Sequence, residues 1–339
     1  MRHIGAPSER LLRQARLPLL AHDDPQAVVP ELFVWDLARR VARSEGVADY
    51  GGLAATLTPV WQSEPALVSV LQTTPTLWLA LRTFCRLADR VTTAAPFHVH
   101  RQRDHALFWR EKRPGTPGED QAELYSLHVM IQLVQVAAGR QWIPPEVLVS
   151  EVNTRRLRDW QANGGARVRR CETCTGVLVP AGMLALPMSA IAPVSGEMLP
   201  ERLADDFLES LRAVIGSYLR DRRPDIGLAA EMAGLTERTF QRRLEVAGLS
   251  YRSLLDQIRL RHALAMLCDP GVHVTDIAYD LGFSDVAHFT RAFRRWTTLS
   301  PREFRRRHAH SARDDSGAKG QDDIPARPYP DALPMTHSS

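Results

Sequence analysis

A segment near the C-terminus occurs twice, and this repeat constrains the fold more than any other feature of the chain. Residues 228–248, LAAEMAGLTERTFQRRLEVAG, share a pattern with residues 276–306, DIAYDLGFSDVAHFTRAFRRWTTLSPREFRR. At a spacing of 48 the matches are Ala230 with Ala278, Gly234 with Gly282 and Thr236 with Ser284. After one extra residue in the second copy, the matches are Phe240 with Phe289, Arg242 with Arg291 and Leu244 with Phe293. The repeat predicts two helix–turn–helix units.

Each copy carries the residue types that a tight turn between two helices requires. Gly234 and Gly282 can adopt a positive φ at no steric cost. We expect Thr236 and Ser284 to be the N-caps of the helices that follow, because a hydroxyl oxygen can accept a hydrogen bond from an unpaired amide of the first turn. A small alanine four residues before each glycine lets the two helices cross closely.

The second helix of each unit has an apolar stripe for burial and an opposite face that is free for a partner. Arginine can bond guanine bidentately, glutamine can bond adenine, and small apolar side chains can contact the thymine methyl group. The candidates for base contacts are Arg238, Gln241 and Arg242 in the first unit and Val286, Ala287, Thr290 and Arg291 in the second. For Arg243 or Arg294 taken alone, a merely solvated helix face explains the charge equally well.

Charge and spacing agree with a polyanionic partner. Residues 221–310 hold 15 Arg against 11 Asp and Glu, an excess equal to the formal net charge of +4 of the whole chain. The two lysines are Lys112 and Lys319, so nearly all positive charge is arginine, through either a bias of the genome or selection for bidentate recognition. A long helix is predicted for about 251–268; it would span roughly 27 Å, and successive major grooves lie about 34 Å apart.

The N-terminal region mixes helical and extended patterns. Helical spacing occurs over 30–46 and 65–91, where Pro75 should begin or break a helix, and 119–139 predicts an amphipathic helix. A hairpin is predicted for 97–113, and extended structure for 142–152. The predicted fold is an α+β N-terminal domain followed by an all-α domain with two helix–turn–helix units joined by a long helix.

These patterns divide the chain into five parts. The expected parts are a disordered N-terminus (1–10), an effector-sensing or dimerisation domain (11–190), a linker (191–205), a tandem helix–turn–helix DNA-binding domain (206–308) and a disordered tail (309–339).

Residues 207–308 resemble the DNA-binding domain of the AraC/XylS family of bacterial transcription regulators. The resemblance rests on the tandem units, on the connecting IRLRHALAML, and on Gly282-Phe283-Ser284, Phe289, Arg291, Phe293 and Ser300-Pro301. Family members usually have Lys and a Gly-Xaa-Thr-Pro phrase where this chain has Arg294-Arg295 and Leu299-Ser300-Pro301. The departure leaves the cap and the proline in place.

The N-terminal 190 residues resemble the arabinose-binding-type effector domain of the same family, through RQWIPPEVLVSEV and CTGVLVPAGMLALPM. The jelly-roll sugar pocket of some members does not fit the helical pattern, so its ligand residues are not carried over. The resemblance implies a transcription regulator that binds double-stranded promoter DNA and activates transcription through RNA polymerase. It also implies a small-molecule effector and a homodimer. Two alternatives stay open: a constitutive DNA-binding protein whose N-terminal domain only dimerises, and an enzyme tethered to DNA.

Other motifs favour neither a cofactor nor catalysis. Cys171 and Cys174 form CETC, half a zinc site or a redox pair, but no second CxxC or spaced histidine pair lies nearby. His98, His100 and His105 lack an additional Glu or Cys ligand, and core packing is the favoured role of the large aromatics: Trp61, Trp78, Phe84, Phe97, Phe108, Trp109 and Trp142. No catalytic motif occurs, so no enzyme is expected. Without a signal peptide or an apolar span, we expect a cytoplasmic protein with no membrane partner.

Overall fold

The computed structural model describes residues 6–22, 27–59, 62, 65–91, 95–162, 165–188, 207–221 and 224–314. The predicted linker 191–205 lies outside the described residues, and of the predicted tail only 309–314 lie inside them. The chain divides into two compact parts, Met1–Arg259 and Leu260–Ser339. The division falls within one long helix.

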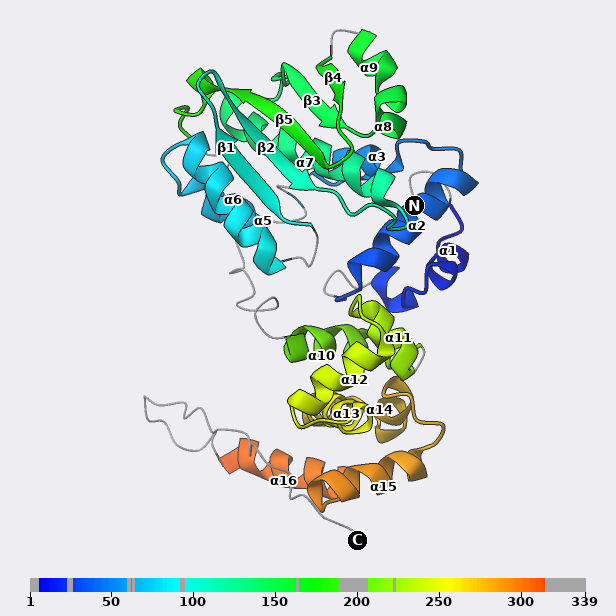
Figure 1. Ribbon diagram of the computed structural model, residues 1–339. Helices are drawn as coiled ribbons and strands as arrows, with labels where there is room; N and C mark the ends of the chain where they lie inside the picture. The colour runs from blue at the N-terminus through cyan, green and yellow to red at the C-terminus, as the bar shows by residue number, and fades with distance from the viewer. Residues whose placement is uncertain are drawn as a thin grey trace. The chain divides into compact units, whose positions relative to one another are not determined.

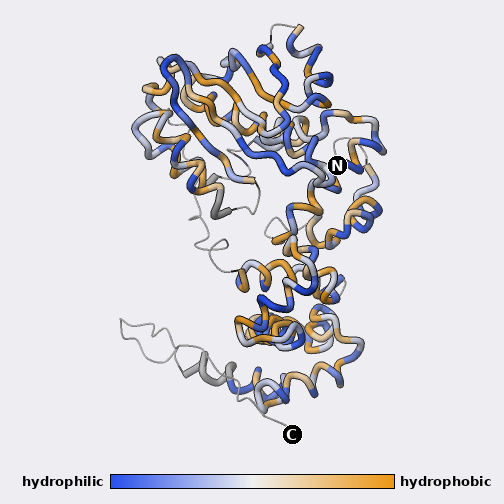
Figure 2. Tube along the Cα trace, in the orientation of Figure 1, coloured by the Kyte–Doolittle hydropathy of each residue, from blue (hydrophilic) through white to orange (hydrophobic). Residues whose placement is uncertain are grey.

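The N-terminal region is built on a five-stranded sheet with the order β1-β2-β5-β3-β4 (Figure 1). Its strands are β1 (Phe97–Arg101), β2 (His105–Glu111), β3 (Glu146–Val149), β4 (Arg167–Arg170) and β5 (Cys174–Pro180). Neighbouring strands are antiparallel except for β3 and β4, which are parallel. The predicted hairpin over 97–113 is confirmed as β1 and β2. Figure 2 shows that the tip of this hairpin is hydrophilic, whereas the strands of the sheet contain long apolar stretches.

Helices surround this sheet. They are α1 (Ser8–Gln14), α2 (Glu31–Ser44), α3 (Tyr50–Leu57), α5 (Pro65–Gln72), α6 (Leu77–Val91), α7 (Glu119–Ala138), α8 (Glu151–Arg156) and α9 (Arg158–Ala162), with 3-10 turns at Leu19–His22 and Ala181–Met183. The expected break near Pro75 is confirmed, because α5 ends at Gln72 and α6 begins at Leu77.

Helix α1 corrects one expectation. Disorder was expected for residues 1–10, but α1 begins at Ser8. Its Leu11 and Leu12 are 2% and 3% exposed. Burial of these two leucines against later segments supplies the apolar contacts that the polar N-terminal sequence does not provide by itself.

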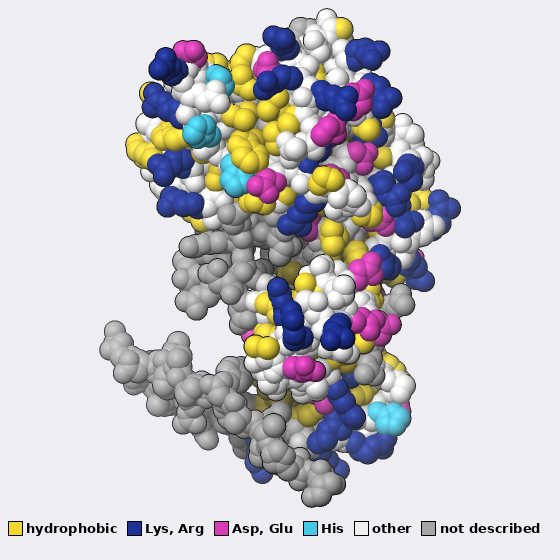
Figure 3. Space-filling view, viewed as in Figure 1, with side chains coloured by type: hydrophobic (Ala, Val, Ile, Leu, Met, Phe, Trp, Pro, Cys, Tyr) yellow, Lys and Arg dark blue, Asp and Glu magenta, His cyan; other side chains and the backbone are white. Residues whose placement is uncertain are grey.

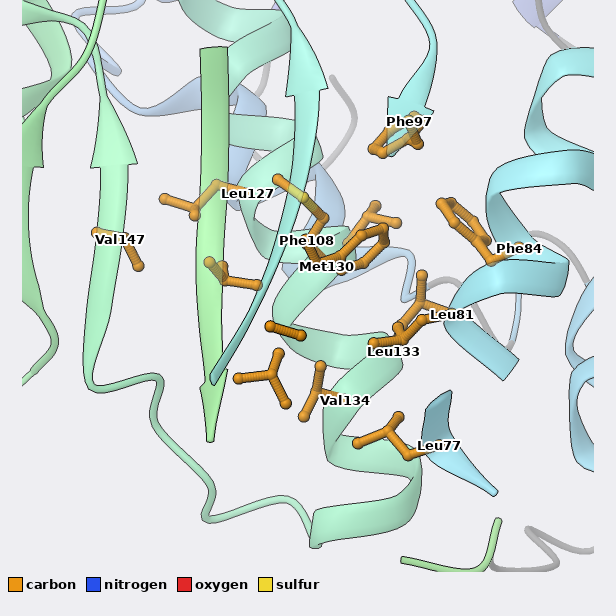
Figure 4. Packing of buried hydrophobic residues seen from close by; sticks show 14 of the residues in the cluster. Leu77, Leu81, Phe84, Phe97, Phe108, Leu127, Met130, Leu133, Val134 and Val147 are labelled. Atoms are coloured by element: carbon orange, nitrogen blue, oxygen red, sulfur yellow. The ribbon is translucent and has the colours of Figure 1, made fainter. Parts of the chain in front are cut away.

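The main core lies between α6, α7 and the sheet. Figure 4 shows Leu81 and Phe84 of α6 directed toward Met130 of α7 and Phe108 of β2. Phe84 meets Phe97 and Phe108 edge-on, with ring centroids 5.1 and 5.7 Å apart. These three aromatics therefore pack in the core, whereas Trp61 lies outside the described residues.

The described residues from Phe207 onward are helical. The elements are α10 (Phe207–Tyr218), α11 (Ile226–Met232), α12 (Glu237–Val246), α13 (Tyr251–Cys268), α14 (Val274–Asp280), α15 (Val286–Thr297) and α16 (Pro301–Asp314). The predicted fold class is confirmed: a sheet-containing N-terminal region precedes a helical region with two helix–turn–helix units joined by α13. Helix α16 continues beyond residue 308, into the segment for which disorder was expected.

Candidate nucleic-acid interface

The turn between α11 and α12 depends on the backbone conformation of one glycine. Gly234 has a φ of 66°, and a Cβ added there would meet nothing within 4 Å. The glycine is therefore needed for its left-handed conformation and not because of crowding. Thr236 follows as the N-cap of α12, and its Oγ1 accepts a hydrogen bond from the amide of Thr239 at 3.3 Å.

The turn between α14 and α15 has a similar glycine but a different cap. Gly282 has a φ of 73°. The N-cap of α15 is Asp285, whose Oδ1 accepts a hydrogen bond from the amide of His288 at 2.7 Å. This bond, the largest influence, lowers the pKa of the Asp285 carboxyl below its ordinary value.

The expectation that Ser284 caps the second helix of this unit is therefore corrected. Ser284 precedes the cap, and its Oγ lies 3.3 Å from the Nδ1 of His288. The extra residue of the second copy is inserted before the cap and not after it. The structural counterpart of Thr236 is thus Asp285, 49 positions later, and the same spacing relates Phe240 to Phe289.

The buried stripe of each second helix is confirmed. Phe240 and Leu244 of α12 are 0% and 1% exposed, and Phe289 and Phe293 of α15 are both 0% exposed. The rings of Phe289 and Phe293 stand 5.7 Å apart within their own unit. Since one face of each helix is fixed against its unit, the direction of the opposite face is fixed as well.

The outward face of α12 is polar. Arg238, Gln241 and Arg242 are all exposed, as base contacts require. Arg243 is exposed too, but its guanidinium carbon lies 5.1 Å from the centroid of the Phe207 ring. Arg243 therefore has a contact within the protein, of the cation–π kind.

The outward face of α15 carries less charge. Ala287 and Arg291 are exposed, whereas Val286 and Thr290 are half-buried. At the spacing of 49, Arg291 is the counterpart of Arg242, so an exposed arginine occupies the same place in both helices.

A groove that the sequence did not reveal lies beside the start of α14. Its volume is about 490 Å³, and it is lined by Pro270, His273, Val274, Thr275, Arg302, Arg305 and Arg306. Arg305 donates to the carbonyls of Leu267 and Val272, at 3.3 and 2.7 Å, and so holds α16 against the end of α13. The run REFRRR was the available signal, but only the fold brings it beside the first turn of α14.

Basic side chains alone do not mark this interface. Figure 3 shows Lys and Arg side chains over the N-terminal region as well as over the C-terminal helices. Among the residues that the structure describes, no group of three or more His, Cys, Asp and Glu is arranged to hold a metal. His98 instead stacks on Trp109, with ring centroids 4.3 Å apart. None of the described helices is long and apolar enough to cross a bilayer.

Two family profiles match the chain. The profile described as the arabinose-binding domain of AraC transcription regulators, N-terminal, matches residues 5–188, and a helix–turn–helix domain profile matches residues 229–307. The first match alone covers more than half of the chain. The chain therefore belongs to the AraC family of DNA-binding transcription regulators.

Individual relatives agree with this assignment. The regulator VqsM of Pseudomonas aeruginosa is 40% identical over 85 residues, 25% of this chain and 26% of the relative. The ornithine utilization regulator of the same species is 32% identical over 136 residues, 38% of this chain and 40% of the relative. The chain thus spans less than half the length of either relative. Both are named as regulators, and the expectation that the chain is not an enzyme is confirmed.

Among solved structures, the transcriptional regulator CdpR from Pseudomonas aeruginosa is similar over 88% of this chain and 96% of its own. The sequence identity is 21% and the TM-score is 0.33.

Proposed function

We propose that this regulator binds promoter DNA through two recognition helices, α12 and α15, each of which enters a major groove. The observation that carries the proposal is the same arrangement in both units: a glycine turn, an N-cap, a buried stripe and an exposed face on the opposite side. Helix α13 joins the units without interruption from Tyr251 to Cys268. A helix that reads DNA needs one face held rigidly and the other free, and both helices meet this requirement.

The two helices have different parts in this proposal. Arg238, Gln241 and Arg242 of α12 supply most of the polar readout, because arginine and glutamine match the hydrogen-bonding edges of guanine and adenine. In α15, Val286 and Ala287 contact thymine methyl groups, and Thr290 and Arg291 add hydrogen bonds. Arg302 and Arg306, beside the first turn of α14, bind backbone phosphates.

The test of readout is Arg242→Ala in the full-length protein. We expect a loss of about 1–3 kcal/mol on an operator selected from random duplexes, with relaxed preference at one or two base pairs. Arg167→Ala is the matched control, because it removes the same charge from an exposed position on β4, outside both units. Equal losses on the operator and on random duplex would instead make Arg242 a phosphate contact.

The test of α15 is Ala287→Asp, which places a negative charge on an exposed position of the helix. If α15 enters a groove, repulsion by phosphates abolishes protection of half of the operator in a footprint, while the helical content stays unchanged. An unchanged footprint would show that only α12 reads DNA.

We also propose that the N-terminal region modulates DNA binding. Residues of α1 and α2 pack against α10 and α11, the first helices of the C-terminal region. The shared cluster contains Leu12, Ala15, Leu17, Phe33, Tyr218, Leu228 and Met232. The guanidinium of Arg16 bonds both carboxylate oxygens of Glu231 in α11, at 2.5 and 2.6 Å.

A small-molecule effector that changes the N-terminal region would act through this contact, with a coupling of about 1–3 kcal/mol on DNA affinity. The regulator would then activate transcription by contact with RNA polymerase, and its N-terminal region would also support a homodimer. The alternative is a constitutive regulator whose N-terminal region only dimerises.

Arg16→Glu tests the coupling, because it places two carboxylates against each other in the contact. Arg13→Glu is the matched control, since Arg13 is an exposed arginine in the last turn of α1, three residues before Arg16. We expect Arg16→Glu alone to change operator affinity and transcription with purified RNA polymerase. If both variants match the unmodified protein on operator DNA, with and without metabolites from the regulated genes, the coupling proposal fails.

A further inference from the structure

Two cysteines face each other in the connection between β4 and β5. Cys171 and Cys174 flank the turn that passes the end of β3, and their Sγ atoms lie 3.1 Å apart. Both side chains are half-buried, so they are accessible to small molecules. Neither the readout of DNA nor the contact of α1 with α11 uses this pair.

The backbone around the pair is held on both sides. The amide of Cys171 donates to the carbonyl of Val149 in β3 at 2.7 Å, and the amide of Lys112 donates to the carbonyl of Thr173 at 3.1 Å. The ammonium of Lys112 donates to the carbonyl of Cys171 at 3.3 Å. Cys174 is already part of β5, opposite Glu111 of β2. The two sulfur atoms are therefore positioned by the sheet and not by a free loop.

The two thiols differ in acidity. Partial burial opposes ionisation of Cys171, but hydrogen bonds from Thr173 and Cys174 outweigh it and lower the pKa of Cys171 to about 7. Burial, together with the neighbouring Cys171, raises the pKa of Cys174 to about 12. At neutral pH the first sulfur is a nucleophile and the second holds its proton, which is the division of roles that thiol–disulfide exchange requires.

We propose that Cys171 and Cys174 form a thiol–disulfide exchange site that reacts with low-molecular-weight disulfides. The Cys171 thiolate attacks one sulfur of the disulfide, the sulfur–sulfur bond breaks, and the first thiolate leaves and takes a proton from water. Cys174 then gives its proton to water, its sulfur attacks the Sγ of Cys171, and the second thiolate leaves and also takes a proton from water. Counting the proton that Cys171 lost when it ionised, the cysteine pair loses two electrons and two protons, and the small disulfide becomes two thiols.

The distance between the two sulfur atoms is close to that in the disulfide that the reaction would form. A disulfide has a sulfur–sulfur bond of about 2.05 Å, so ring closure needs the two sulfurs to approach by only about 1 Å from 3.1 Å. The other two cysteines are internal controls for the reactivity of this pair. Cys85 of α6 packs against the main core, and Cys268 is exposed at the end of α13.

The experiment treats the reduced full-length protein with glutathione disulfide at pH 7. We expect the count of free thiols to fall from four to two, and dithiothreitol to restore it. Both cysteines of the site lie in one tryptic peptide, residues 171–202, which should lose the mass of two hydrogens. The double variant Cys85→Ser/Cys268→Ser should react at the same rate as the unmodified protein.

Single variants separate the two roles. Cys174→Ser should stop at a stable glutathione adduct on Cys171. In Cys171→Ser the site should react at least about ten-fold more slowly, because burial keeps the remaining thiol, Cys174, protonated at pH 7. In the Cys85→Ser/Cys268→Ser variant, alkylation by iodoacetamide should show a midpoint near pH 7. The proposal is overturned if the unmodified protein keeps a glutathione adduct on Cys171, if only Cys268 reacts, or if the midpoint lies at that of a free thiol.

Discussion

Replacement of Glu123 of α7 should destabilise the N-terminal region, because its buried carboxylate joins several segments. Its carboxylate is 1% exposed and accepts hydrogen bonds from three residues of distant segments. The donors are the amide of Ser150 (2.7 Å), the hydroxyl of Ser150 (2.5 Å), the Nδ2 of Asn153 (2.5 Å) and the hydroxyl of Thr175 (2.9 Å). The buried ammonium of Lys112 lies 3.4 Å from its Oε1.

The substitution Glu123→Gln keeps the shape of the side chain and removes the charge. One oxygen of glutamine can still serve the amide of Ser150 and the hydroxyl of Thr175. Its NH₂ group then faces the Nδ2 of Asn153, which already donates to the carbonyl of Asp120 at 2.9 Å and cannot accept. One charge-assisted bond is lost, and Lys112, 7% exposed, loses its buried counter-charge and keeps only the exposed carboxylate of Glu172, at 4.0 Å. Breaking one partner of a buried pair in this way costs about 3–5 kcal/mol.

The assay is urea unfolding of the full-length protein followed by tryptophan fluorescence, since six of the seven tryptophans precede residue 161. The double variant Glu123→Gln/Lys112→Met should recover about 1–3 kcal/mol, because it also removes the buried ammonium that has lost Glu123. A loss below about 1 kcal/mol for Glu123→Gln, or no recovery in the double variant, would refute the argument that the pair is fully desolvated.

The remaining predictions concern single positions. Tyr218→Phe should raise the free energy of unfolding by about 1 kcal/mol, because its buried hydroxyl has no hydrogen-bond partner among the described residues. Tyr251→Phe should lower it by a similar amount, about 1 kcal/mol, since that hydroxyl donates to a backbone carbonyl at 2.7 Å. Asp285→Ala should lower the melting temperature of the second unit and Ser284→Ala should not. The pKa of Asp285 is lowered in the folded state, so its carboxylate stabilises the fold at pH values above the ordinary aspartate pKa. This stabilisation is lost as the pH falls through the lowered pKa. Ala278→Glu buries a charge at a 0% exposed position and should unfold that unit, as loss of helical circular dichroism would reveal.

Local patterns in the sequence determined the elements of this protein. The period of apolar residues predicted α7 and the hairpin of β1 and β2, and the repeated glycine turn predicted both helix–turn–helix units, since each depends on residues a few positions apart. The same reasoning predicted which residues of α12 and α15 are buried. Which of the exposed residues contact bases stays a prediction, because exposure alone does not separate base contacts from phosphate contacts.

Only the tertiary structure decided which distant segments meet. Placement of β5 between β2 and β3, the gathering of donors around Glu123, and the approach of Cys171 to Cys174 depend on pairings across the sheet that no local period encodes. Disorder was expected for residues 1–10, yet α1 begins at Ser8, and its Leu12 is buried in a cluster that includes Met232, far away in the chain. The cap of α15 shifted by one residue for a related reason. Two side chains of similar capping ability, Ser284 and Asp285, are adjacent. Asp285 is the N-cap because it lies four residues before the buried Phe289, just as Thr236 lies four residues before the buried Phe240.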